Sequence, residues 1–136
     1  MVVSTRVFVY GTLLKGLCRH GALRKARFLG RAHTHGQLFD LGSYPGLKAG
    51  PGTVHGEVYE VDALTLSRLD RIEDYDPNRP TNSLYLRVHR EATLQGGRRL
   101  QVQTYLYNRP ARPTDLIAHG DYRAHCLPAG DADKVR

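Results

Sequence analysis

Residues 53–73 read TVHGEVYEVDALTLSRLDRIE, and this segment predicts a strand followed at once by a helix. Over residues 53–61, apolar and polar side chains alternate, which is typical of a β-strand with one buried face. Asp62 is a residue type favoured at helix N-caps. The next apolar side chains recur three positions apart and share one helix face: Leu66, Leu69 and Ile72. We therefore predict a helix over residues 63–73.

Strand-like segments also lie on both sides of this unit. Residues 6–10 form a β-branched and aromatic run that ends at Gly11, as expected for a buried strand. Further strands are predicted at residues 32–41, 84–94 and 100–107, and Gly96-Gly97 between the last two is a hairpin signal. Shorter helices are predicted at residues 17–29 and 115–126, and turns at residues 42–46, 50–52 and 75–78.

In this pattern strands outweigh helices, and the two do not alternate as they would in a doubly wound sheet. We predict an α+β fold: a small, strongly curved mixed β-barrel with short flanking helices. The barrel is expected to form a single domain over residues 1–127, with residues 128–136 as a disordered tail.

The composition excludes several classes of protein. A chain of 136 residues suits one compact domain, and no segment approaches the roughly 20 apolar residues of a transmembrane helix. The first residues lack the apolar core of a secretory signal. Cys18 and Cys126 cannot form a disulfide framework and lack the spacing of a zinc site. We expect a cytoplasmic protein without membrane segments, whose two thiols are buried or inert.

A net charge of +7 raises the question of nucleic-acid binding. Most of the excess lies between Lys15 and Arg31. No nucleic-acid-binding motif accompanies these charges, so we expect a solvated surface and no nucleic-acid partner.

Candidate chemistry begins at Tyr10-Gly11-Thr12-Leu13, directly after the first predicted strand. A turn with glycine and a small hydroxyl residue exposes successive backbone N–H groups, which can hold a carboxylate or an oxyanion. A plain strand-to-helix turn is the alternative, since the segment is neither a Walker loop nor a dinucleotide-binding loop.

A second candidate is the acidic cluster at the end of the predicted helix, formed by Asp70, Glu73, Asp74 and Asp76. Glu73 borders the apolar stripe, where burial would raise its pKa toward the range of a general acid or base. Asp70 and Asp74 flank it and are expected to raise the pKa further by repulsion. A solvent-exposed acidic helix end is the alternative. No metal ligands are predicted, because calcium-loop spacing is absent and the histidines are scattered.

Several short blocks resemble the γ-glutamylcyclotransferase family, also called AIG2-like, which includes the γ-glutamylamine cyclotransferases. In chain order they are VFVYGTL (7–13), FLG (28–30), LGSYPG (41–46), LDRIEDYDP (69–77), YLR (85–87), TYLY (104–107) and GDYR (120–123). The resemblance implies a small β-barrel with flanking helices, in agreement with the predicted elements.

The resemblance also implies roles for individual residues. Glu73 matches the family's catalytic glutamate, a general acid/base. The family's substrate-holding loop corresponds to Tyr10, Gly11, Thr12 and Leu13, and its pocket-lining rings to Tyr85 and Tyr105. Asp74 stands where the family commonly has glycine, which changes the backbone freedom and the charge beside Glu73.

The implied reaction converts a γ-glutamyl amine, amino acid or peptide into 5-oxoproline and the free amine. The substrate's own α-amine attacks its γ-carbonyl, which makes the reaction intramolecular. The implied partner is a small γ-glutamyl substrate, and no cofactor or metal is required. Two alternatives stay open: a non-catalytic small-molecule-binding protein that retains the family pocket, and a nucleic-acid-binding protein.

Overall fold

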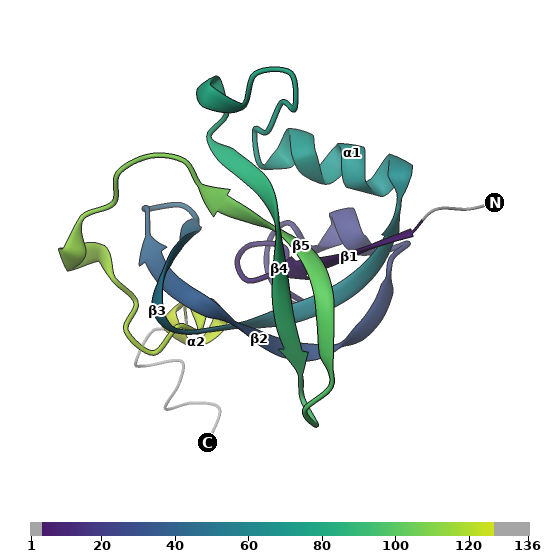
Figure 1. Ribbon diagram of the computed structural model, residues 1–136, viewed down its shortest axis with the longest axis horizontal. Helices are drawn as coiled ribbons and strands as arrows, with labels where there is room; N and C mark the ends of the chain where they lie inside the picture. Colours follow the sequence, from purple (N-terminus) through teal and green to yellow (C-terminus); the bar gives the residue numbers. More distant parts are fainter. Residues whose placement is uncertain (1–3, 127–136) are drawn as a thin grey trace.

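Five strands form a closed β-barrel in the computed structural model, which describes residues 4–126 (Figure 1). The strands are β1 (Ser4–Val9), β2 (Arg27–Asp40), β3 (Pro45–Asp62), β4 (Tyr85–Leu94) and β5 (Arg99–Tyr107). Around the barrel they lie in the order β1-β3-β2-β4-β5. The pairs along this order are antiparallel, whereas β1 and β5 close the barrel in parallel. The predicted small mixed barrel is therefore confirmed.

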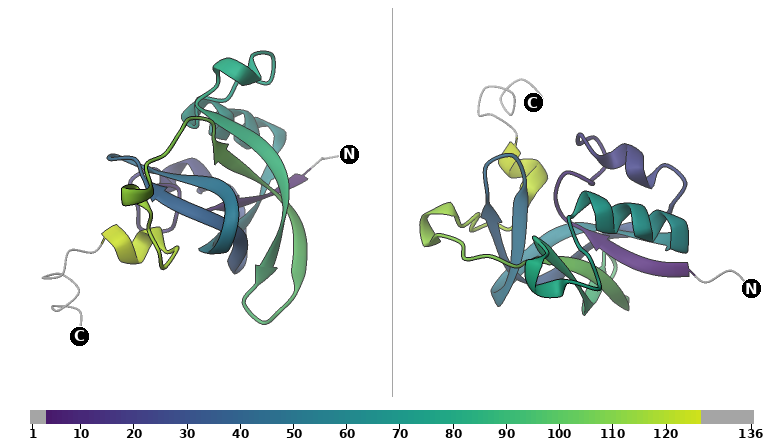
Figure 2. Two further views of the ribbon diagram at one scale, coloured as in Figure 1. Left: turned by 60° about the vertical axis from the view of Figure 1, so that its left-hand side comes forward. Right: turned by 90° about the horizontal axis from the view of Figure 1, so that it is seen from above.

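Short helices flank the barrel: α1 (Ala63–Ile72), α2 (Tyr122–Cys126) and the 3₁₀ turns η1 (His20–Leu23), η2 (Pro80–Asn82) and η3 (Pro113–Asp115). The predicted helix at 63–73 is confirmed as α1. Its N-cap is Asp62, whose Oδ1 accepts a hydrogen bond from the Thr65 N–H at 2.8 Å. Figure 2 shows α1 lying beside β1, and it contacts β1, β3 and η1.

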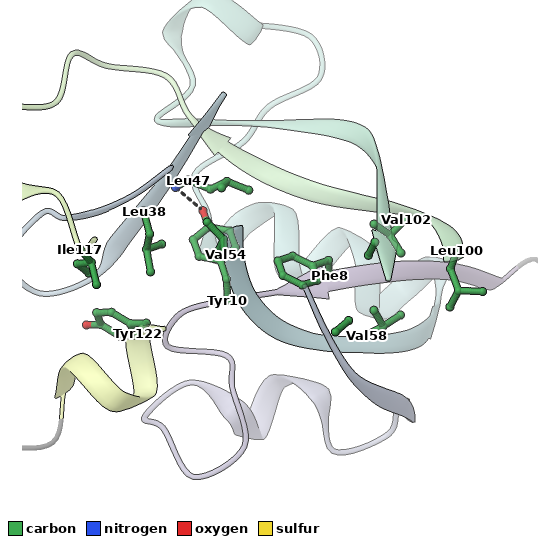
Figure 3. Packing of buried hydrophobic residues seen from close by; sticks show 12 residues of the cluster. Phe8, Tyr10, Leu38, Leu47, Val54, Val58, Leu100, Val102, Ile117 and Tyr122 are labelled. Carbon is green, nitrogen blue, oxygen red and sulfur yellow. Dashed lines mark hydrogen bonds between the residues drawn. The ribbon is translucent and has the colours of Figure 1, made fainter. Parts of the chain in front are cut away.

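The apolar core has two parts because β1 is buried on both faces. On one face, Phe8 packs inside the barrel with Val58 and Val102 (Figure 3). On the other face, Val7 and Val9 pack in a second cluster that includes Leu69 of α1. The second face of β3 is also buried, since Tyr59 and Val61 belong to this second cluster. The predicted strand with one buried face is therefore buried on both faces.

The helix predicted at residues 17–29 is wrong apart from one turn. Only His20–Leu23 form a 3₁₀ turn, and β2 begins at Arg27. Gly16 has a φ of 87° and no N-cap side chain supports the turn, so a longer helix is not favoured. Phe28 instead pairs with Tyr59 in the β2–β3 ladder.

The turn predicted at residues 50–52 lies inside a strand. β3 runs without a break from Pro45 to Asp62. The turn predicted at residues 42–46 therefore ends before Pro45. The glycines at 50 and 52 nevertheless mark an irregularity in the strand, because the β2–β3 register shifts here. His35 pairs with Thr53, but Gln37 pairs with Lys48. Residues 49–52 therefore bulge out of the ladder.

Predictions near the C-terminus were only partly correct. The strands predicted at 84–94 and 100–107 are confirmed as β4 and β5. The helix predicted at 115–126 is reduced to α2, because Gly120 adopts a φ of 69° directly before it. The tail predicted at 128–136 lies outside the described residues. Cys18 and Cys126 are both exposed, which contradicts burial, the first of the two predicted alternatives. That the thiols are inert stays a prediction.

Candidate functional site

A cavity of about 120 Å³ lies at the end of β1, beside the C-terminal end of α1, the start of β4 and the end of β5. Its wall includes all seven residues to which the family resemblance assigns a catalytic or substrate-binding role: Tyr10, Gly11, Thr12, Leu13, Glu73, Tyr85 and Tyr105. Residues far apart in the chain thus meet around one small cavity.

Glu73 is the carboxylate of this cavity. It is the C-cap of α1, and its backbone N–H donates to the carbonyl of Leu69, a fully buried residue of the last helical turn, at 2.9 Å. The side chain keeps some exposed area because it faces the cavity, yet protein surrounds it closely. Burial raises the pKa of Glu73 to about 7, and the nearby Arg19 opposes this rise.

The two neighbouring aspartates do not act as predicted. Neither Asp70 nor Asp74 contributes to the raised pKa of Glu73, so the predicted like-charge repulsion was wrong. Asp70 instead accepts a hydrogen bond from the Tyr105 hydroxyl at 2.6 Å, and the Arg87 Nε lies 3.1 Å from the same oxygen. Asp70 therefore holds a ring of the cavity wall. Sequence reasoning missed this role, because Arg87 is distant in the chain.

Asp74 adopts a backbone conformation that favours glycine. Its φ of 52° is the one positive value among non-glycine residues from 4 to 126. Aspartate tolerates this left-handed region better than most residues. The side chain is exposed, so the replacement of the family's glycine changes the end of α1 without placing a second carboxylate in the cavity.

The 10–13 loop offers backbone donors to the cavity. The carbonyls of Gly11 and Thr12 accept hydrogen bonds from Leu14 N–H at 3.0 Å and Arg19 N–H at 2.8 Å. The N–H groups of Thr12 and Leu13 have no protein acceptor within the described part of the chain. Free N–H groups beside a cavity are suited to hold a carboxylate.

Gly11 is required by close packing. A Cβ at this position would lie 2.6 Å from Cγ of Pro45, which is closer than side chains approach. Its backbone is not in the left-handed region. The loop therefore passes directly over the start of β3, and any side chain here would displace it from the cavity wall.

The three tyrosines supply rings to the wall, while their hydroxyls bind protein groups. Tyr10 donates to the Tyr105 carbonyl at 2.7 Å and accepts from Leu47 N–H, as Figure 3 shows. Tyr85 donates to the Pro45 carbonyl at 2.5 Å. Burial raises the pKa of Tyr10, Tyr85 and Tyr105 above its ordinary value. These rings are neutral at physiological pH and are held in fixed positions.

An ion pair between a buried glutamate and a partly exposed arginine holds the segment that follows the 10–13 loop, and sequence reasoning missed it. Glu57 of β3 is 3% exposed, and its Oε1 accepts from Lys15 N–H at 3.0 Å. Arg123 of α2 donates to Glu57 Oε2 at 3.0 Å and to the Lys15 carbonyl at 2.6 Å. Burial would raise the pKa of Glu57, but these donors outweigh it and lower the pKa. Both backbone polar groups of Lys15 are thus fixed.

Residues 4–126 form neither a metal-binding cluster nor a membrane-spanning helix. Between residues 4 and 126, no three His, Cys, Asp or Glu side chains lie together as a metal-binding group. None of the helices in this range is long and apolar enough to span a bilayer.

The fold and cavity define a small α+β barrel protein with a carboxylate, Glu73, in the wall of its cavity, and its sequence and fold match those of one known family. The family described as Gamma-glutamyl cyclotransferase, AIG2-like, matches residues 7–124. A relative from Vibrio cholerae is 51% identical over 70 residues, which are 50% of this chain and 61% of that protein. The Gamma-L-glutamyl-butirosin B gamma-glutamyl cyclotransferase of Niallia circulans is 41% identical over 110 residues, 79% of this chain and 70% of that one.

A solved structure agrees with the sequence matches. The crystal structure of a mouse AIG2-like protein aligns with a TM-score of 0.72 at 30% identity, and the alignment covers 88% of each chain. The chain belongs to the gamma-glutamyl cyclotransferase, AIG2-like family.

Proposed function

We propose that this protein is a γ-glutamyl cyclotransferase whose general acid/base is Glu73. The observation that carries the proposal is the meeting, in one cavity, of a carboxylate with a pKa of about 7 and the free N–H groups of the 10–13 loop. A group with a pKa near the working pH can both accept and return a proton. The family membership and the Niallia circulans relative support the same activity.

The reaction needs few protein groups. The α-amine nitrogen of the substrate attacks its own γ-carbonyl carbon, and the bond from that carbon to the leaving nitrogen breaks. Glu73 takes the proton that the attacking amine loses and gives it to the departing amine. The products are 5-oxoproline and a free amine. Holding the substrate folded supplies much of the rate, because the two reacting groups already belong to one molecule.

The 10–13 loop and the tyrosine rings bind the substrate. The N–H groups of Thr12 and Leu13 bind the α-carboxylate of the glutamyl part. Tyr10, Tyr85 and Tyr105 enclose the glutamyl chain and exclude water, which keeps Glu73 protonatable near neutral pH.

The proposal is tested by Glu73→Gln, with release of 5-oxoproline from a panel of γ-glutamyl compounds as the measurement. Glutamine keeps the shape of the side chain but cannot carry a proton. We expect turnover to fall on the order of 100-fold or more, with KM little changed. Asp76→Asn is the matched control, because Asp76 is exposed and does not line the cavity.

The main alternative is a non-catalytic binding protein. Binding of γ-glutamyl compounds by the parent protein without release of 5-oxoproline would establish it. Full turnover by the Glu73→Gln variant would show that the catalytic assignment is wrong.

A further inference from the structure

Arg19 is a cation in the wall of the cavity. It lies in the segment after the 10–13 loop, and its own N–H binds the Thr12 carbonyl at 2.8 Å, so its position is tied to that loop. Its Nη1 lies 3.4 Å from the Ile72 carbonyl, next to Glu73 in sequence. The residue as a whole is exposed, which places it at the cavity mouth.

The guanidinium of Arg19 has no carboxylate partner in residues 4–126. Arg87 and Arg123, by contrast, are each paired with a carboxylate near the site. Arg19 is therefore available to an anionic ligand that enters the cavity. An arginine donates several N–H groups in a plane, which suits binding of a carboxylate.

The cavity thus has two separate elements that favour anions. One is the pair of N–H groups at Thr12 and Leu13, which are buried. The other is Arg19 at the mouth. A γ-glutamyl amino acid carries two carboxylates, one on the glutamyl part and one on the amino acid that leaves. A γ-glutamyl derivative of a simple amine carries only the first.

The size of the cavity determines which carboxylate meets which element. With about 120 Å³ of space, the interior takes the glutamyl part, whose γ-carbonyl must lie beside Glu73. The leaving group then extends toward the mouth. Its carboxylate is one carbon away from the departing nitrogen, so it lies close to Glu73 and to the neighbouring Arg19.

We propose that Arg19 is a specificity-determining residue that binds the carboxylate of the leaving amino acid. This inference rests on the proposed function and adds the substrate class: γ-glutamyl compounds whose leaving group carries a carboxylate next to the scissile amide. The bonds formed and broken are those of the proposed reaction, and Arg19 itself neither gives nor takes a proton.

The test compares γ-glutamylalanine with γ-glutamylethylamide, which differ in that carboxylate. For the parent protein we expect kcat/KM to be higher with γ-glutamylalanine. In Arg19→Met, kcat/KM for γ-glutamylalanine should fall about 10-fold or more, mainly through KM, since a hydrogen bond between charged groups is lost. Because Arg19 also lowers the pKa of Glu73, its loss affects proton transfer with both substrates alike, and γ-glutamylethylamide measures that shared effect. The ratio of the two kcat/KM values should therefore fall about 10-fold, because only γ-glutamylalanine loses a bond to Arg19.

Arg24→Met is the matched control, since Arg24 is an exposed arginine of the same segment that does not line the cavity. It should leave both substrates unaffected. Arg19→Lys keeps the charge and should recover part of the preference for γ-glutamylalanine. Equal losses on both substrates would overturn the inference, because Arg19 would then act through Glu73 or the glutamyl part, which both substrates share.

Binding measurements separate a failure of this inference from a failure of the proposed function. Calorimetry with both compounds is carried out in the Glu73→Gln protein, with and without Arg19→Met. A weaker affinity for γ-glutamylalanine alone on loss of Arg19 supports the inference even if the parent protein releases no 5-oxoproline. Unchanged affinity for γ-glutamylalanine would overturn it, whether or not the protein is an enzyme.

Discussion

Burial raises the pKa of Glu73 to about 7, whereas a glutamate in an unfolded chain titrates near 4.5. Below pH 4.5 the carboxyl is protonated in both states and has no effect on stability. As the pH rises from 4.5 to 7, the unfolded chain loses the proton more readily, so the free energy of unfolding falls. Above pH 7 the ionised carboxylate of Glu73 destabilises the folded state by about 3 kcal/mol, the free energy that corresponds to a shift of this size.

Glu73→Gln should therefore stabilise the protein in a pH-dependent way. Glutamine resembles the protonated form and avoids the cost of a buried charge. We expect the variant to exceed the parent by about 3 kcal/mol at pH 8 and to match it near pH 4, in urea unfolding at both pH values. An equal difference at the two pH values would mean that packing, not ionisation, causes it.

The short helix α2 acts on the cavity through one side chain. Arg123 holds both Glu57 and the Lys15 carbonyl, so it connects α2 to the segment that follows the 10–13 loop. Arg123→Met would leave the buried Glu57 without its cationic partner, at a cost of about 2 kcal/mol for a pair that is partly exposed. Hydrogen exchange of the amides in residues 12–19 should become faster.

Arg112→Met provides the comparison for this variant. Arg112 pairs with Asp115 on the surface, away from the cavity, and should change neither stability nor exchange in residues 12–19. If Arg123→Met also leaves the exchange of residues 12–19 unchanged, α2 does not support the loop.

Elements with strong local signals were predictable from the sequence, and those set by distant pairing were not. Helix α1 has a cap and an apolar stripe, and the β4–β5 hairpin has two glycines at its turn. The segment at 17–29 has only a weak helical pattern, so pairing of Phe28 with Tyr59 determines its structure. The cavity residues were found through short motifs. Glu57 and Arg123 carry no local signal, because their contact depends on the closed barrel.

At the scale of the whole molecule, the basic residues between Lys15 and Arg31 are mostly exposed. Arg24, Lys25 and Arg27 are exposed, and Arg27 lies 4.0 Å from Glu60, which partly neutralises it. We predict no retention on duplex DNA at physiological salt, because no nucleic-acid-binding motif accompanies these charges. A filter-binding titration over a range of salt checks this. Tight, salt-sensitive binding that is lost on replacing these three residues by glutamine would contradict it.

The parallel contact that closes the barrel has a consequence for how the protein is made. Val7 of β1 pairs with Gln103 of β5, so two strands from opposite parts of the chain must meet. Contacts between such distant segments form slowly, because a long loop must first be ordered. On the ribosome, β1 emerges first and has to wait for β5. Tyr105 belongs to β5 and lines the cavity, so the cavity wall is incomplete until β5 has joined the barrel.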